Sequence, residues 1–129
     1  MSTLDSKATK DKFVLNTDTL VQKYRQWFDT DPFEFDTSVN LALKSANNAN
    51  EASEKAKKMN SSSMTNSALG RILPLAIMTS KLETSEEVKK AVIKDVELTH
   101  ANPVVQEMIF VYCDTLRFLL CYTNDEERA

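Results

Sequence analysis

The sequence has few of the residues that build phosphate-binding loops and metal sites. Its 129 residues include one Gly, one His, two Cys and three Pro. A single Gly rules out a glycine-rich phosphate loop and disfavours tight β-hairpins, because both need backbone conformations that glycine supplies. One His excludes multi-histidine metal sites and most histidine relays. The remaining composition is rich in helix-forming residues, so we expect an all-α protein.

Long apolar runs and a strong charge of either sign are also missing. No apolar stretch approaches the ~18 residues of a transmembrane helix, and the polar residues 1–12 do not resemble a signal peptide. The 16 basic and 19 acidic residues are mixed along the chain, so we expect no nucleic-acid-binding face. Cys113 and Cys121 are eight residues apart on one expected helix, too far to form a disulfide. We therefore expect a soluble cytoplasmic protein with two reduced cysteines and no membrane partner.

The dominant pattern is helical periodicity within one domain. We expect a disordered lead over residues 1–15, a helical domain over 16–122 and a polar tail over 123–129. Apolar residues at helical spacing predict a compact bundle of about five helices. They are expected over residues 18–28, 37–59, 66 to about 77, 84–99 and 103 to about 120. Thr84 and Glu87 have the spacing of a capping box, and Asn102 is expected to cap the last helix.

Three short motifs bear on function. Residues 66–75 read NSALGRILPL, residues 98–103 read LTHANP, and YRQW at 24–27 is followed by DPFE at 31–34. The first resembles the N-G-x-x-M-R-I-x-P-L element of the ADP-ribosylglycohydrolases, and the second resembles that family's L-T-H-x-x-P. The third is similar to its R-Y-x-x-W and the D-x-G-x-T-T turn. The resemblance covers roughly residues 18–122 and corresponds to the middle third of a typical family member.

This resemblance implies an all-helical fold and recognition of ADP-ribose. Family enzymes cleave the glycosidic bond between ADP-ribose and a protein side chain with two divalent ions, usually magnesium. Those ions are held by a T-D-D-T motif near the start and a D-x-D-T motif near the end, since hard cations prefer carboxylate oxygens. In the family, the Asn of N-G and the His of L-T-H lie near the bound ADP-ribose. The matching residues Asn66 and His100, with Ser67 at the Gly position, form the candidate ligand-binding rim.

Neither metal-binding motif occurs in this sequence. Residues 17–19 read TDT and lack the second Asp of T-D-D-T, while residues 29–31 read DTD and precede Pro32 in an expected turn. We therefore predict no metal ligand, no cofactor and no catalytic residue in this chain. Gly70 also stands where the family motif has Met. The resulting interpretation is a truncated relative that lacks metal-dependent hydrolase activity and keeps either an ADP-ribose-binding rim or a protein-interaction role.

Structural explanations and other functions stay open beside this interpretation. Asn66 is also a suitable N-cap, His100 a suitable helix end, and Arg71 a suitable partner for a carboxylate or carbonyl. The chain could instead be an active hydrolase domain completed by another chain or by missing segments, or a helical structural subunit of a larger assembly. Expected partners are ADP-ribose, an ADP-ribosylated protein, a protein partner or a second copy. The expected contact surface is either the face with Ile109, Tyr112 and Leu116 or the alanine stripe of residues 42–56.

Overall fold

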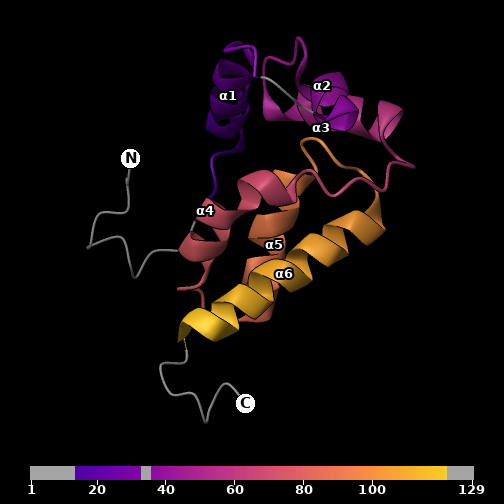
Figure 1. Ribbon diagram of the computed structural model, residues 1–129. Helices are drawn as coiled ribbons and strands as arrows, with labels where there is room; N and C mark the ends of the chain where they lie inside the picture. The colour runs from indigo at the N-terminus through magenta and orange to yellow at the C-terminus, as the bar shows by residue number, and fades with distance from the viewer. Residues whose placement is uncertain (1–13, 33–35, 122–129) are drawn as a thin grey trace.

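The computed structural model describes residues 14–32 and 36–121, which form six α-helices and no strand. The helices are α1 (Thr17–Phe28), α2 (Thr37–Leu43), α3 (Ala49–Met59), α4 (Leu69–Thr79), α5 (Ser85–Val96) and α6 (Pro103–Cys121). Helices α1 to α3 form one group, and α4 to α6 form a second group beside it (Figure 1). The all-α prediction is therefore confirmed.

The helix expected over residues 37–59 is two helices, so that prediction was wrong. Ser45 has a φ of 65°, a left-handed conformation that cannot continue a right-handed helix. The Asn48 side chain then accepts the N–H of Glu51 at 2.9 Å and caps α3. The Glu51 carboxylate accepts the N–H of Asn47 at 2.9 Å. Asn side chains compete for backbone hydrogen bonds in this way, which favours a helix start over a helix interior.

Each of the two groups of helices packs around its own hydrophobic cluster. The upper cluster lies among α1, α2 and α3 and includes Val21, Leu43 and Ala52, together with Leu98 from the turn after α5. The lower cluster lies among α4, α5 and α6 and includes Ile72 and Val92. Four side chains of the alanine stripe are fully buried, and Ala49 is partly buried against the upper cluster; the four are Ala42, Ala46, Ala52 and Ala56. This stripe packs inside the chain and is not the free contact surface that one expectation assigned to it.

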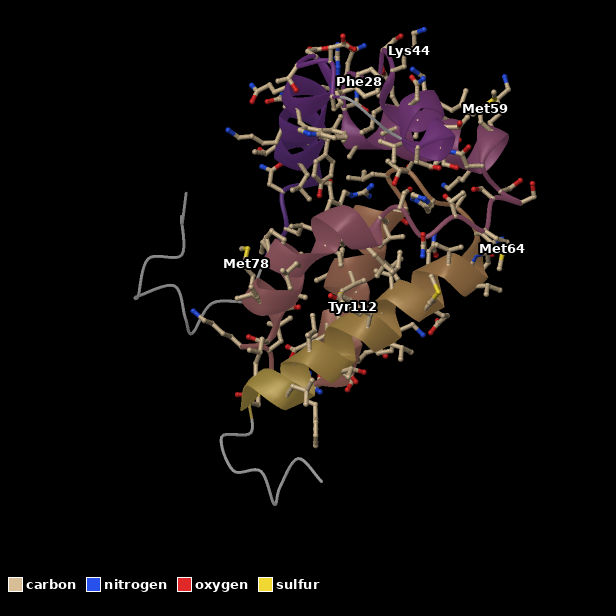
Figure 2. All side chains as sticks on the ribbon, in the orientation of Figure 1. Phe28, Lys44, Met59, Met64, Met78 and Tyr112 are labelled. Carbon is tan, nitrogen blue, oxygen red and sulfur yellow. The ribbon has the colours of Figure 1, made fainter. Side chains whose placement is uncertain are left out.

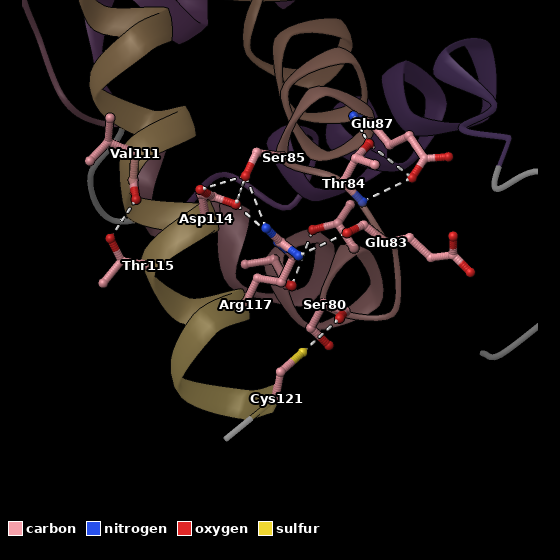
Figure 3. Close-up of polar contacts among 12 residues, drawn as sticks. Ser80, Glu83, Thr84, Ser85, Glu87, Val111, Asp114, Thr115, Arg117 and Cys121 are labelled. Atoms are coloured by element: carbon pink, nitrogen blue, oxygen red, sulfur yellow. Dashed lines mark hydrogen bonds and ion pairs between the residues drawn. The ribbon is translucent and has the colours of Figure 1, made fainter. Parts of the chain in front are cut away.

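The C-terminal half of α6 is tied to the start of α5 by polar side chains (Figure 3). The Asp114 carboxylate accepts from the Ser85 hydroxyl at 3.0 Å and from Arg117 Nε at 2.9 Å. Arg117 Nη2 also donates to Ser85 Oγ at 2.9 Å. One turn further along, Cys121 Sγ donates to the Ser80 carbonyl at 3.3 Å. These contacts fix the direction in which α6 crosses the lower group.

The two cysteines are both free, in different surroundings. Cys113 is buried in the lower cluster, and burial, with the nearby Asp95 charge, raises its pKa to about 12. It therefore packs as a small apolar residue. Cys121 is exposed, so only Cys113 is part of the core.

One face of α6 exposes a row of apolar side chains that the polar Thr115 interrupts. This α6 stripe consists of Val104, Met108, Val111, Tyr112 and Leu119. Figure 2 shows Tyr112 on the outward side of the helix. The exposed face of α6 therefore differs from the contact face predicted from the sequence. Of the predicted residues, Ile109 is fully buried and Leu116 is half-buried against the lower cluster. In the part of the chain that the structure describes, no helix is long and apolar enough to cross a membrane.

The predicted lead over residues 1–15 and tail over 123–129 lie almost wholly outside the described residues. Leu15, the last residue of that lead, is half-buried against the lower cluster. The helical domain expected over 16–122 is described except for residues 33–35 and 122.

Candidate functional site

A pocket of about 450 Å³ lies where α1, α2 and the start of α4 meet. This volume lies within the usual range for small-molecule sites. The residues around it come from both groups of helices and are Tyr24, Trp27, Asp36, Val39, Leu43, Ser67, Gly70 and Arg71. Most of this wall is apolar or aromatic, and Asp36 and Ser67 provide its polar end.

Asp36 is the N-cap of α2, and its carboxylate collects hydrogen bonds from several directions. Oδ2 accepts the N–H of Ser38 at 2.9 Å and the hydroxyl of Thr65 at 3.2 Å, and the side chain also bonds Ser67. Burial by itself raises the pKa of Asp36, but the hydrogen bonds from Ser67, Ser38 and Thr65 outweigh burial and hold that pKa below its ordinary value. Asp36 is therefore an ionised acceptor at the polar end of the pocket.

His100 is fully buried directly behind this polar end. Its Nε2 lies 3.0 Å from the Thr65 hydroxyl and 3.1 Å from the Ser67 hydroxyl. Its Nδ1 lies 2.7 Å from Thr99 Oγ1. Burial, and secondarily the positive charge of Arg71, lowers the pKa of His100 to about 4. The imidazole is therefore neutral at physiological pH and supports the pocket without lining it.

The hydrogen-bond network assigns the tautomer of His100. Thr65 Oγ1 donates its proton to Asp36 Oδ2 and therefore faces His100 Nε2 as an acceptor. Arg71 Nη1 donates to Thr99 Oγ1 at 2.7 Å, which leaves the Thr99 proton for His100 Nδ1. The neutral ring then carries its proton on Nε2, which donates toward the Ser67 and Thr65 hydroxyls. Both hydroxyls in turn bond Asp36. The network thus runs in one direction, from a guanidinium through the imidazole to an ionised carboxylate.

Arg71 is held by a buried partner rather than left free for a ligand. Its Nε lies 3.1 Å from Asp95 Oδ1, and its Nη2 donates to the Asp95 carbonyl at 3.0 Å. The Tyr24 hydroxyl donates to the same carboxylate at 2.9 Å, and the guanidinium lies 4.8 Å from the centre of the Tyr24 ring. Burial and the adjacent Asp95 charge raise the pKa of Tyr24. The expected pairing of Arg71 with a carboxylate and a carbonyl is confirmed.

The three residues of the predicted rim occupy different positions. Ser67 lines the pocket, His100 lies behind it, and Asn66 is exposed and is not among the lining residues. The Asn66 carbonyl accepts the N–H of Leu69 at 2.9 Å. The cap position of α4 belongs to Ala68, which makes no side-chain cap bond. The prediction that the Asn66 side chain caps α4 was therefore wrong, because a turn separates Asn66 from the start of the helix.

Asp36 is the site residue that the sequence interpretation missed. An Asp directly before a helical Thr-Ser pair is a recognisable N-cap signal. That signal predicts a helix start only. Nothing in the local sequence indicates that residues 65–67 fold against the same carboxylate.

The two acidic segments that resemble metal motifs have structural roles. Asp18 Oδ1 accepts the N–H of Ala49 at 2.8 Å and so joins α1 to the start of α3. Asp29 is the C-cap of α1. Among residues 14–32 and 36–121, no group of three His, Cys, Asp or Glu side chains gathers as a metal site. The described residues therefore do not fit the magnesium pair that the resemblance implies.

Comparison with known proteins identifies the family. The sequence model of the ADP-ribosylglycohydrolases matches residues 1–125. The chain belongs to the ADP-ribosylglycohydrolase family. It is also 28% identical over 97 residues to a protein of Acanthamoeba polyphaga mimivirus that is named as an ADP-ribosyl glycohydrolase. That match covers 72% of this chain and 29% of the viral protein, so the chain spans less than a third of its relative. No solved structure matches significantly.

Proposed function

We propose that this ADP-ribosylglycohydrolase-family domain binds ADP-ribose, free or attached to a protein, in the pocket between α1, α2 and α4. The observation that carries the proposal is an ionised Asp36 beside the Ser67 hydroxyl at one end of a cavity of about 450 Å³. Ser67 belongs to the motif that resembles the family's ligand-binding element. Within the predicted rim, Ser67 contacts the ligand and His100 holds Ser67 in place, while Asn66 lies outside the residues that line the pocket.

The chemistry of this polar end suits a polyhydroxylated group. Ribose hydroxyls are donors, and Asp36 is an acceptor that stays ionised over the physiological pH range. Ser67 Oγ is held by His100 and Asp36 and has a second lone pair that can accept from a neighbouring hydroxyl. Hydrogen bonds to a charged acceptor are the stronger kind, which favours an interaction with this end of the pocket.

We further propose that the domain by itself does not carry out metal-dependent hydrolysis, and that it acts in the cytoplasm. Asp18, the acidic residue of the TDT segment, is already engaged by the backbone of α3. The neutral His100 lies behind Ser67 and is not among the residues that line the pocket. Asp18 and His100 are therefore not placed in the pocket as an acid or a base for cleavage.

Titration calorimetry with ADP-ribose, with and without magnesium, tests this function. We expect a dissociation constant of about 0.1–1 mM, within reach of a few hydrogen bonds, and no dependence on magnesium. Asp36→Asn keeps a good N-cap residue while removing the charge, so it should weaken binding without unfolding the chain. Asn50→Ala, at an exposed position of α3, is the matched control. Release of ADP-ribose from a modified protein that a chelator abolishes would contradict the proposal.

The exposed α6 stripe supports a second candidate function. A row of apolar side chains on one helix is typical of a surface that contacts another protein. This observation favours a helical structural subunit, or a hydrolase domain completed by another chain. Under either alternative the α6 stripe is the contact surface, and sedimentation of the wild-type chain and of a charged variant of the stripe tests it.

A further inference from the structure

Helix α6 exposes residues at the spacing of a coiled-coil interface. Val104, Met108, Val111, Thr115 and Phe118 follow one another at intervals of four, three, four and three residues. We call these five residues the α6 seam; it shares its first three members with the α6 stripe. Its apolar side chains are between 41% and 60% exposed, and Thr115 is exposed too. A repeat of 3.5 residues keeps such a row turned toward one partner helix along its whole length.

Thr115 is the polar residue of the α6 seam, and its hydroxyl is already used within the helix. Thr115 Oγ1 donates to the Val111 carbonyl at 2.7 Å, one turn earlier. A Thr that bonds back to the helix in this way needs no other acceptor for its proton. Apolar side chains can therefore cover the seam without leaving a buried donor unpaired.

The two flanks of the α6 seam differ in polarity. Tyr112 and Leu119 each follow a seam residue and border it on one side, whereas Glu107 and Asp114 each precede one and border it on the other. In a parallel pair of helices, each apolar flank would meet the acidic flank of the partner. An antiparallel pair brings apolar flank to apolar flank, so that no carboxylate is buried against Tyr112 or Leu119. It also opposes the two helix dipoles.

The acidic flanks of two copies can approach because their charges are compensated within each chain. Glu107 pairs with Lys89 of α5, and Asp114 Oδ1 lies 2.9 Å from Arg117 Nε. Neither carboxylate is thus left to repel an identical copy as an unpaired charge. The flank is compatible with a second copy of this chain.

The exposed area suits a weak dimer. The α6 seam with Tyr112 and Leu119 exposes on the order of 500 Å² per chain, whereas a standard interface buries ~800 Å² per partner. Helix α6 is already ordered by its packing on α4 and α5, so association does not have to order it first. Figure 1 shows α6 along the outer side of the lower group.

We infer that α6 is the interface of a twofold-symmetric dimer, in which the α6 seam packs antiparallel on the seam of a second copy. Val111 is the middle residue of the five and therefore lies near the twofold axis. The inference rests on the second candidate function and deepens it by naming the partner. It is independent of ADP-ribose binding, because the pocket lies between α1, α2 and α4. For this area we expect a dissociation constant of about 10–100 μM.

Sedimentation of the full chain from about 5 to about 200 μM tests the partner. Wild type should show a reversible monomer–dimer equilibrium. Val111→Glu and Val111→Lys should each weaken dimerisation by about tenfold or more, because two like charges meet near the axis. An equimolar mixture of these two variants should restore association to within about threefold of wild type, since Glu then faces Lys. Only an interface that brings the two copies of position 111 together predicts this recovery.

Ile77→Glu is the matched control. Ile77 is 50% exposed on α4 and lies outside the α6 seam, so this variant should dimerise within about twofold of wild type. Circular dichroism verifies that each variant is folded. Three results would overturn the inference: a monomeric wild type over the whole series, equal weakening by Ile77→Glu, or a Glu–Lys mixture that stays monomeric.

A nitroxide label on Cys121 tests the orientation of the two helices. Cys121 is the exposed thiol near the end of α6, whereas Cys113 is buried and stays unlabelled. An antiparallel dimer places the two labels at opposite ends of the interface, at least about 25 Å apart, and a parallel dimer places them within about 20 Å. Pulsed dipolar spectroscopy measures this distance, and a short distance would show that the antiparallel arrangement is wrong.

Calorimetry with ADP-ribose on Val111→Glu keeps the two proposals separate. The monomeric variant should bind ADP-ribose as wild type does, because residue 111 is not among those that line the pocket. If wild type binds ADP-ribose but stays monomeric, the dimer is wrong and the proposed function stands. If wild type dimerises but does not bind ADP-ribose, the proposed function fails and the dimer stands.

Discussion

His100 shows how one buried side chain can order a site that it does not line. Its neutral ring accepts a hydrogen bond from Thr99, which is itself bonded by Arg71. On its other side the ring donates to the Ser67 and Thr65 hydroxyls. These hydroxyls then bond Asp36, which stays ionised. The orientation of the pocket's polar end is therefore determined behind its surface, in a region that water does not reach.

The lowered pKa of His100 predicts a specific pH dependence of stability. The pKa is about 4 in the folded chain and about 6.5 when unfolded, so the unfolded chain binds more protons between these values. Stability is fully present above pH 6.5 and is lost as pH falls toward 4. The loss from this one group is roughly 2–4 kcal/mol. Denaturant unfolding at a series of pH values measures it.

His100→Gln removes the titrating group and retains an amide donor. Because the chain has one histidine, this variant should be less stable at neutral pH but nearly independent of pH between 6.5 and about 4. Carboxylates with a lowered pKa, such as Asp36, change the stability mainly at pH values on the acidic side of this interval. An unchanged slope in His100→Gln would show that another group causes the dependence.

The position of His100 could not be predicted from the sequence, although its importance could. The LTHANP motif singled it out, and a helix end was the natural local explanation. Its burial depends on Thr65 and Ser67, which are more than thirty residues away and come together only through packing. Local sequence patterns carry no information on such contacts, so they could not predict the lowered pKa of His100.

At the level of elements, strong local signals gave correct predictions and weak ones did not. The capping box of Thr84 and Glu87 is present, and Asn102 Oδ1 accepts the N–H of Val104 at 3.0 Å as an N-cap does. The prediction of one long helix over 37–59 was wrong because the helical spacing of the alanines continues across the break between α2 and α3. Ser45 and Asn48 end one helix and begin the next through side-chain and backbone geometry that a hydrophobic pattern does not include.

The two faces of α6 should respond differently to truncation. Ile109 is fully buried in the lower cluster, so Ile109→Ala should cost about 2–5 kcal/mol of unfolding free energy. Leu119, on the same helix, is 42% exposed, and Leu119→Ala should change stability by about 0.5 kcal/mol or less. The half-buried Leu116 should give an intermediate loss. Denaturant midpoints compare the three variants, and equal losses would mean that α6 does not sit as described.

For the whole molecule, the α6 stripe predicts association. Exposed apolar rows of this kind usually mark contact surfaces, so we expect concentration-dependent self-association near ~100 μM or a stable partner. Val111→Glu, in the middle of the stripe, should shift sedimentation toward the monomer. Met59→Glu, at the exposed end of α3 and away from the stripe (Figure 2), is the control and should leave association unchanged. A wild-type chain that sediments as a monomer at this concentration contradicts the prediction of self-association.

The separation of the two hydrophobic clusters also has a dynamic consequence. The layer between them is polar and includes Tyr24, Arg71, Asp95 and His100. Helices α1 to α3 can therefore open as one sub-global unit while α4 to α6 stay folded, and their backbone amides should exchange with deuterium faster. The pocket has walls on both sides of this layer. Any ligand that fills it must suppress that opening, so slowed amide exchange in α1 and α2 reports occupancy even for a ligand whose chemistry is unknown.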